Sequence, residues 1–110
     1  MNDIILSDQR CIACEGGVPL LTSERIEELK SKLKTPWEVI ENKKIRREFK
    51  FADFKEAMVF VNKIAEIAES EGHHPDLRIS YNQVQIELWT HAVNGLSKND
   101  FILAAKIEKI

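Results

Sequence analysis

Three histidines form the clearest group of residues in this chain that could transfer protons. His73 and His74 are adjacent, and His91 follows later in the sequence. Because imidazole changes its charge near neutral pH, a histidine cluster can supply both a general acid and a general base. Asp100 is the next acidic residue after His91, and a carboxylate can orient an imidazole through its second ring nitrogen. We therefore expect the three histidines and Asp100 to form one acid–base site.

The elements expected around these residues bring them to one end of a sheet. Gly72 is typical of a helix C-cap, so the histidine pair begins directly after a helix. Residues 77–80 and 84–90 have the pattern of two strands, and a turn around Asn82 would join them as a hairpin. Antiparallel pairing then places His91 near the level of the histidine pair. Alternation along the second strand puts the side chain at position 91 on its polar face.

Another hairpin and its preceding helix are expected earlier in the chain. A helix begins at Thr22 or Ser23 and ends by Lys34, because Pro36 disfavours the helical region for the residue before it. Residues 37–40 and 44–51 have strand character, with a tight turn between them. Ile45, Phe49 and Phe51 share one face of the second strand, whereas Arg47 interrupts that apolar face.

The middle of the chain contains the strongest helix pattern. Asp53 and Glu56 have the spacing of a capping box. The face that we expect to be buried consists of Phe54, Ala57, Met58, Val61, Ile64, Ala65 and Ala68. Phe60 and Ile67 lie outside this stripe, so the apolar sector is wide. Such a sector fits either a deeply buried helix or one that also contacts another subunit.

Ser97 and Asp100 have the spacing of a second capping box, ahead of a helix near the C-terminus. The capping role alone would also explain Asp100. The order helix, hairpin, helix, hairpin, helix predicts an α+β fold, in which helices pack on one face of a four-stranded antiparallel sheet. We expect an irregular N-terminal segment over residues 1–21 and a single domain over residues 22–110.

Composition and charge exclude several classes of protein. The formal net charge of −2 argues against direct nucleic-acid binding, because backbone phosphates favour a basic excess. No apolar stretch approaches the ~18 residues that cross a bilayer, and the first ten residues do not resemble a signal peptide. The only cysteines are Cys11 and Cys14, so we expect a cytoplasmic protein with reduced thiols.

A metal site is the main alternative for the histidines. One histidine of the pair, together with His91 and Asp100, would make a two-histidine, one-carboxylate ligand set. The ligand spacing typical of zinc is absent, and we predict no metal. Cys11 and Cys14 form a single CxxC pair, which fits half of a shared metal site, a redox pair or two ordinary reduced thiols.

The spacing of the candidate residues resembles the signature of the pterin-4a-carbinolamine dehydratases. The matching positions are Glu69, His73, His74, Pro75, Tyr81, His91 and Asp100. The resemblance runs from about Thr22 to the C-terminus. It implies a hydro-lyase that converts 4a-hydroxytetrahydrobiopterin to quinonoid dihydropterin and water in tetrahydrobiopterin recycling, without a metal or organic cofactor. It also implies a homodimer or homotetramer.

The resemblance assigns roles to individual positions. It implies that His73, His74 and His91 are catalytic, and that Glu69, Pro75, Thr90, Ala92, Val93 and Asp100 belong to the substrate site. Two positions depart from the family pattern: Leu77 stands where many relatives have tryptophan, and Trp89 is bulkier than the residue often found there. The alternative function is that of an interaction protein, either a dimerisation cofactor or a transcriptional coactivator. The intact set of histidines favours catalysis.

Overall fold

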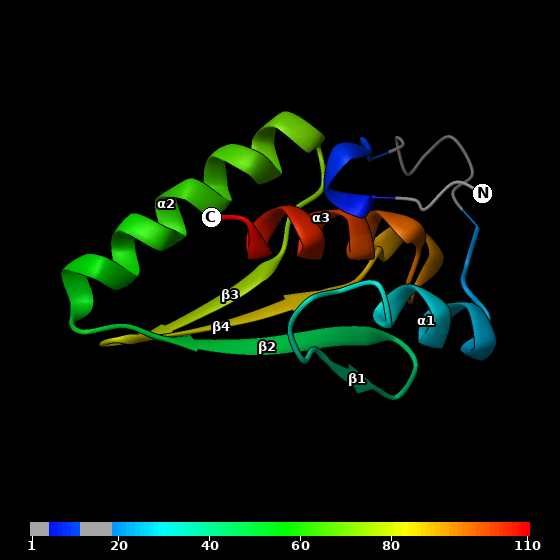
Figure 1. The fold of residues 1–110 in the computed structure, drawn as a ribbon, viewed down its shortest axis with the longest axis horizontal. Coiled ribbons are helices and arrows are strands. Elements are labelled where there is room, and N and C mark those ends of the chain that lie inside the picture. The colour runs from blue at the N-terminus through cyan, green and yellow to red at the C-terminus, as the bar shows by residue number, and fades with distance from the viewer. Residues whose placement is uncertain (1–4, 12–18) are drawn as a thin grey trace.

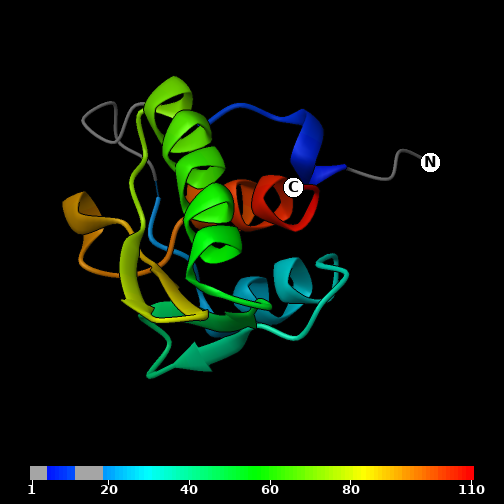
Figure 2. The same cartoon turned by 90° about the vertical axis from the view of Figure 1, so that its left-hand side faces the viewer.

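A four-stranded antiparallel sheet with helices on one face forms the fold of the chain (Figures 1 and 2). The computed structural model describes residues 5–11 and 19–110. In chain order, the elements are the 3₁₀ helix η1 (Leu6–Asp8), helix α1 (Ser23–Lys30), strands β1 (Glu38–Ile40) and β2 (Lys44–Lys50), helix α2 (Phe54–Glu71), strands β3 (Asp76–Ser80) and β4 (Gln83–Leu88), the 3₁₀ helix η3 (His91–Val93) and helix α3 (Lys98–Glu108). The predicted α+β class and element order are confirmed.

The sheet has the strand order β1-β2-β4-β3, so the two predicted hairpins pair through β2 and β4. Side chains alternate between its faces, as strand geometry requires. Ile45, Val84 and Ile86 are fully buried beneath the helices. Arg47, which interrupts the apolar pattern of β2, places its guanidinium 4.0 Å from the centre of the Phe49 ring. The cation is thus accommodated beside an aromatic ring at the edge of the core.

Helix α2 has the predicted N-cap, Asp53, but the Glu56 carboxylate accepts from the N–H of Ala52 and does not complete the predicted capping box. The helix is also rotated from the predicted orientation. Asp53 accepts a hydrogen bond from the backbone N–H of Glu56, and Gly72 ends the helix with a φ of 67°. The expectation that Phe54 and Ala65 belong to the buried face is wrong, because both are exposed. The buried residues are Ala57, Phe60, Val61, Ile64 and Ala68. The ring of Phe60 packs against Phe49 and Phe51, at 4.7 and 4.9 Å between ring centres, and this contact turns the helix toward Phe60.

Strand β4 is shorter than predicted. It ends at Leu88 rather than at Thr90, because the backbone of Thr90 pairs with Gly95 instead of continuing the sheet. The Thr90 N–H donates to the Gly95 carbonyl at 2.7 Å. This pairing closes a small loop that contains η3 and His91. The loop, rather than a strand end, therefore presents His91.

The N-terminal segment packs on the C-terminal helix. Leu6 of η1 is buried in the core, and the Lys106 ammonium of α3 donates to the carbonyl of Ser7 at 3.0 Å. Cys14, and with it the pairing of Cys11 and Cys14 considered above, lies outside the described residues. No helix in the described part of the chain has the length and apolar character needed to span a membrane.

Candidate acid–base site

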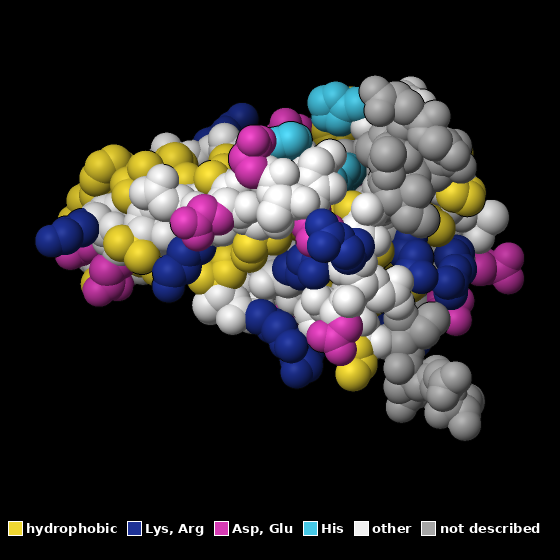
Figure 3. Space-filling model, turned by 90° about the horizontal axis from the view of Figure 1, so that it is seen from above, with side chains coloured by type: hydrophobic (Ala, Val, Ile, Leu, Met, Phe, Trp, Pro, Cys, Tyr) yellow, Lys and Arg dark blue, Asp and Glu magenta, His cyan; other side chains and the backbone are white. Residues whose placement is uncertain are grey.

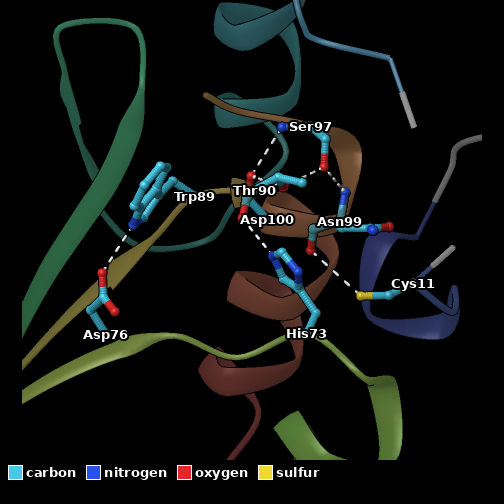
Figure 4. Close-up of polar contacts among 8 residues, drawn as sticks. All are labelled: Cys11, His73, Asp76, Trp89, Thr90, Ser97, Asn99 and Asp100. Carbon is cyan, nitrogen blue, oxygen red and sulfur yellow. Dashed lines mark hydrogen bonds and ion pairs between the residues drawn. The ribbon is translucent and has the colours of Figure 1, made fainter. Parts of the chain in front are cut away.

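A buried histidine–aspartate pair lies where the end of α2 meets the start of α3 (Figure 4). His73 follows the C-cap of α2, and Asp100 is in the first turn of α3. The His73 Nε2 atom is 2.6 Å from Asp100 Oδ1, and the two side chains are 6% and 0% exposed. The predicted proximity of these residues therefore takes the form of a direct hydrogen bond, shielded from water.

The two oxygens of Asp100 have different partners. Oδ1 accepts from His73, whereas Oδ2 accepts from the backbone N–H of Ser97 at 2.9 Å and from the hydroxyl of Thr90 at 2.8 Å. The bond to Ser97 completes the predicted capping box. Asp100 thus caps α3 and binds His73 at the same time.

The hydroxyl groups beside Asp100 form an ordered chain of donors. Since Thr90 gives its single hydroxyl hydrogen to Asp100, the Ser97 hydroxyl must donate to Thr90, across 2.7 Å. The Ser97 oxygen in turn accepts from the backbone N–H of Asn99 at 3.2 Å. Every buried side-chain nitrogen and oxygen in the described residues has a partner, so this network is complete as it stands.

The hydrogen bond to Asp100 defines the chemistry available to His73. An ionised carboxylate only accepts hydrogen bonds, so the hydrogen of a neutral His73 imidazole resides on Nε2. The lone pair is then on Nδ1, which can take a proton from a ligand and later return it. The Asp100 carboxylate stabilises the imidazolium that this transfer creates.

His74 has a carboxylate partner of its own but a very different environment. Its Nε2 atom is 2.6 Å from Glu69 Oε2, and the two side chains are 59% and 79% exposed. Water screens such a pair, which therefore contributes little to stability. Because the His74 side chain is exposed, its imidazole is accessible to a ligand.

His91 is exposed and stacks on the indole of Trp89, with 4.0 Å between the ring centres and 27° between the ring planes. The indole N–H donates to Asp76 Oδ2 at 2.9 Å (Figure 4). Neither Trp89 nor Asp76 is among the predicted site residues. The sequence does contain a signal for the contact between Trp89 and His91, because side chains two residues apart in an extended segment lie on the same side.

The remaining predicted site residues differ in their accessibility. Pro75 and Val93 are half-buried and Ala92 is exposed, whereas Thr90 is fully buried and its hydroxyl is bonded within the protein. Histidine side chains gather on one part of the molecular surface (Figure 3). Among the described residues, no three histidine, cysteine, aspartate or glutamate side chains are grouped so that they could hold a metal ion.

The N-terminal segment contacts Glu71, which lies two residues before His73, and Asn99, which precedes Asp100. The Cys11 N–H donates to Glu71 Oε1 at 2.8 Å, and the Cys11 thiol donates to the carbonyl of Asn99 at 3.6 Å. Glu71 also lies 3.6 Å from the Lys106 ammonium. Burial, reinforced by the charge of Glu71, raises the pKa of the Cys11 thiol to about 12. These contacts join residues far apart in the sequence, and no local pattern indicates them.

We expect the Cys11 thiol to be inert in the folded protein. At pH 8 a thiol with a pKa of about 12 contains on the order of 10³-fold less thiolate than an ordinary cysteine, and the thiolate is the reactive form. Iodoacetamide labelling of a Cys14→Ser variant, followed by mass spectrometry, isolates Cys11. Equal labelling rates in buffer and in denaturant would contradict this expectation.

Glu71 should make stability depend on pH. Burial alone would raise the pKa of its carboxyl, but the Cys11 N–H and the Lys106 charge outweigh burial and lower the pKa below 4.5. The contribution of Glu71 is therefore present above pH 4.5 and is lost as the pH falls through the lower folded pKa. At pH 7, Glu71→Gln should reduce the free energy of unfolding by about 1–2 kcal/mol. Urea unfolding of the wild type and of Glu71→Gln, from pH 7 to below pH 4.5, should show that the difference between their unfolding free energies shrinks as the pH falls. A difference that does not depend on pH would contradict this role of Glu71.

Comparison with known proteins identifies close relatives. A family model described as pterin 4 alpha carbinolamine dehydratase matches residues 19–110. A relative from Rickettsia canadensis that carries the name pterin-4-alpha-carbinolamine dehydratase is 51% identical over 104 residues, which make up 94% of this chain and 95% of that protein. A relative of the same name from Legionella pneumophila (strain Corby) is 52% identical over 106 residues, covering 96% of this chain and 94% of that protein.

Two solved structures are also similar to this chain. A protein from Brucella melitensis described as a transcriptional coactivator/pterin dehydratase has a TM-score of 0.77 and 34% identity, covering 83% of this chain and 97% of its own. A pterin dehydratase-like protein described as a RuBisCO assembly factor in the alpha-carboxysome has a TM-score of 0.59 and 18% identity. The match covers 69% of this chain and 89% of that protein. The second match indicates a shared fold alone.

Proposed function

The chain belongs to the pterin-4a-carbinolamine dehydratase family, and we propose that it dehydrates 4a-hydroxytetrahydrobiopterin to quinonoid dihydropterin and water. In this role it is a hydro-lyase of tetrahydrobiopterin recycling. The observation that carries the proposal is the buried hydrogen bond between His73 and Asp100, which prepares an imidazole for proton transfer. The proposal places the enzyme in the cytoplasm, a compartment that suits the free thiol of Cys11.

The reaction requires two proton transfers and no external electrons. The hydroxyl on C4a takes up a proton and leaves as water, while N5 loses its proton and a C4a–N5 double bond forms. One proton is supplied and one is removed, so the protein returns to its starting charge. A pair of imidazoles in opposite protonation states can do both near neutral pH.

We assign the two proton transfers to the three histidines. His73 exchanges its proton through Nδ1, because Nε2 is bound to Asp100. His74 and His91 are exposed and can approach the substrate directly. Glu69 and Asp100 orient imidazoles, and the substrate site includes Pro75, Ala92 and Val93. Thr90 contributes through its hydrogen bond to Asp100, since its side chain is buried.

The direct test is an assay of carbinolamine decay. A phenylalanine hydroxylase generates the 4a-carbinolamine, and the decay is followed optically with and without the purified protein. We expect faster decay with the folded protein, unchanged after dialysis against a chelator, and no acceleration by the same protein in unfolded form. Decay at the buffer rate in the presence of folded protein would overturn the proposed function.

We also propose that the chain forms a homodimer or homotetramer. Phe54 and Val59 on α2 are each 50% exposed, and Leu77 and Ile79 on the edge strand β3 are 36% and 39% exposed. Apolar side chains exposed on a helix and on a strand at the edge of the sheet are typical of surfaces that another copy covers. Light scattering after size-exclusion chromatography should give a multiple of the chain mass, lowered by Val59→Glu or by Ile79→Glu. A monomer at micromolar concentration would contradict this.

A further inference from the structure

The indole of Trp89 is held between two charged side chains and one imidazole. Its N–H donates to Asp76 Oδ2 at 2.9 Å, and the Lys44 ammonium lies 5.6 Å from the centre of the indole. Its ring stacks on that of His91 at 4.0 Å. The side chain is half-buried, although it belongs to the polar face of the sheet.

The end of β4 explains why Trp89 occupies this place. Thr90 is turned inward by its bonds to Asp100 and Ser97, so Trp89 must point to the opposite, polar face. Asp76 lies on that face too, since it pairs with Glu87 at the start of β3. The hydrogen bond from Trp89 to Asp76 therefore connects the segment that follows the histidine pair to the segment that precedes His91.

His91 depends on this arrangement for its orientation. It is exposed, and within the described part of the chain the stack on Trp89 is the one ring, ionic or hydrogen-bond contact recorded for its imidazole. His73 and His74 are different, because each is fixed by a carboxylate. Without the indole, the His91 imidazole would have no ring, ionic or hydrogen-bond partner among the described residues to fix its rotamer.

We propose that Trp89 is a positioning residue that holds the His91 imidazole in the orientation used for proton transfer, with Asp76 holding the indole. This inference rests on the proposed dehydratase function. Aromatic pairs of this kind raise the population of the stacked arrangement, relative to the unstacked one, by up to about tenfold. A small residue at position 89 could not cover the imidazole in this way.

Nuclear magnetic resonance tests the stack without substrate. The ring current of the indole should shift the His91 ring-proton signals upfield in the wild type, and assignment follows from the signal that His91→Ala removes. The upfield shift should be lost in Trp89→Leu and largely kept in Trp89→Phe, which preserves an aromatic face. His91 signals that are unchanged in Trp89→Leu would overturn the proposal.

Kinetics then tests the consequence for catalysis. Trp89→Leu should lower kcat about fivefold, whereas Trp89→Phe should stay within about twofold of the wild type. In a His91→Ala background Trp89→Leu should have no further effect, because the indole acts through the imidazole. Glu48→Leu, on the same polar face of the sheet in β2, is the matched control and should retain the wild-type kcat.

The outcomes separate this inference from the function on which it rests. A wild type that does not accelerate carbinolamine decay overturns the proposed function. An active wild type with an unchanged kcat in Trp89→Leu overturns only the role of Trp89, and so does an equal loss of kcat from Trp89→Leu with and without His91.

Discussion

Replacing His73 with alanine should lower kcat for carbinolamine dehydration by about 10²–10⁴-fold, the typical contribution of one positioned proton transfer. The imidazole that is lost is fixed by Asp100 at 2.6 Å, and its side chain is 6% exposed. Water replaces such a group poorly, because a buried cavity does not hold water in the orientation that the reaction requires. The decay of enzymatically generated carbinolamine, followed optically under saturating substrate, measures the effect.

A glutamine at position 73 provides the matched control. His73→Gln retains an amide N–H that can donate to Asp100 but has no group that accepts a proton near neutral pH. It should lose kcat as the alanine variant does, while its free energy of unfolding remains within about 1 kcal/mol of the wild type. A wild-type kcat in either variant would remove His73 from the mechanism.

Replacing Asp100 with alanine should destabilise the protein by about 3 kcal/mol or more. The His73 ring, the Thr90 hydroxyl and the Ser97 N–H would lose their acceptor together. The site is fully buried, so water cannot easily take the place of the carboxylate. Because domains of this size are stable by about 5–15 kcal/mol, urea unfolding should show a large shift in midpoint.

Two milder variants separate the contributions of Asp100. Asp100→Asn retains one carbonyl oxygen as an acceptor and should fall between alanine and the wild type. Thr90→Val removes one donor to Oδ2 without disturbing the bond to His73 and should cost about 1–2 kcal/mol. An Asp100→Ala protein with the unfolding free energy of the wild type would show that the network does not contribute to stability.

The fold could be predicted largely because its signals are local. The capping residues Asp53 and Ser97, the C-cap Gly72 and the alternation along β2 and β4 each reveal an element from a few neighbouring residues. The rotation of α2 could not be predicted in this way. It depends on Phe49 and Phe51, which belong to another segment and meet Phe60 only after the chain has folded.

The grouping of His73 with Asp100 could be predicted from the sequence, but the bond between them could not. Sequence spacing brings His73, His91 and Asp100 to one end of the sheet, yet it cannot tell a capping carboxylate from one that binds an imidazole. The structure removes that choice, because the two oxygens of Asp100 do both. The contact of Cys11 with Glu71 spans 60 residues and has no sequence signature.

The double use of Asp100 restricts how this protein can be altered by mutation. A change at position 100 that removes the carboxylate from His73 also removes the first-turn cap of α3, so proton transfer and thermal stability cannot be varied independently there. Glu69 is exposed, and among the described contacts it binds only His74, so a substitution there does not remove a helix cap as well. Laboratory evolution of the catalytic rate should therefore accumulate substitutions at position 69 while position 100 stays unchanged.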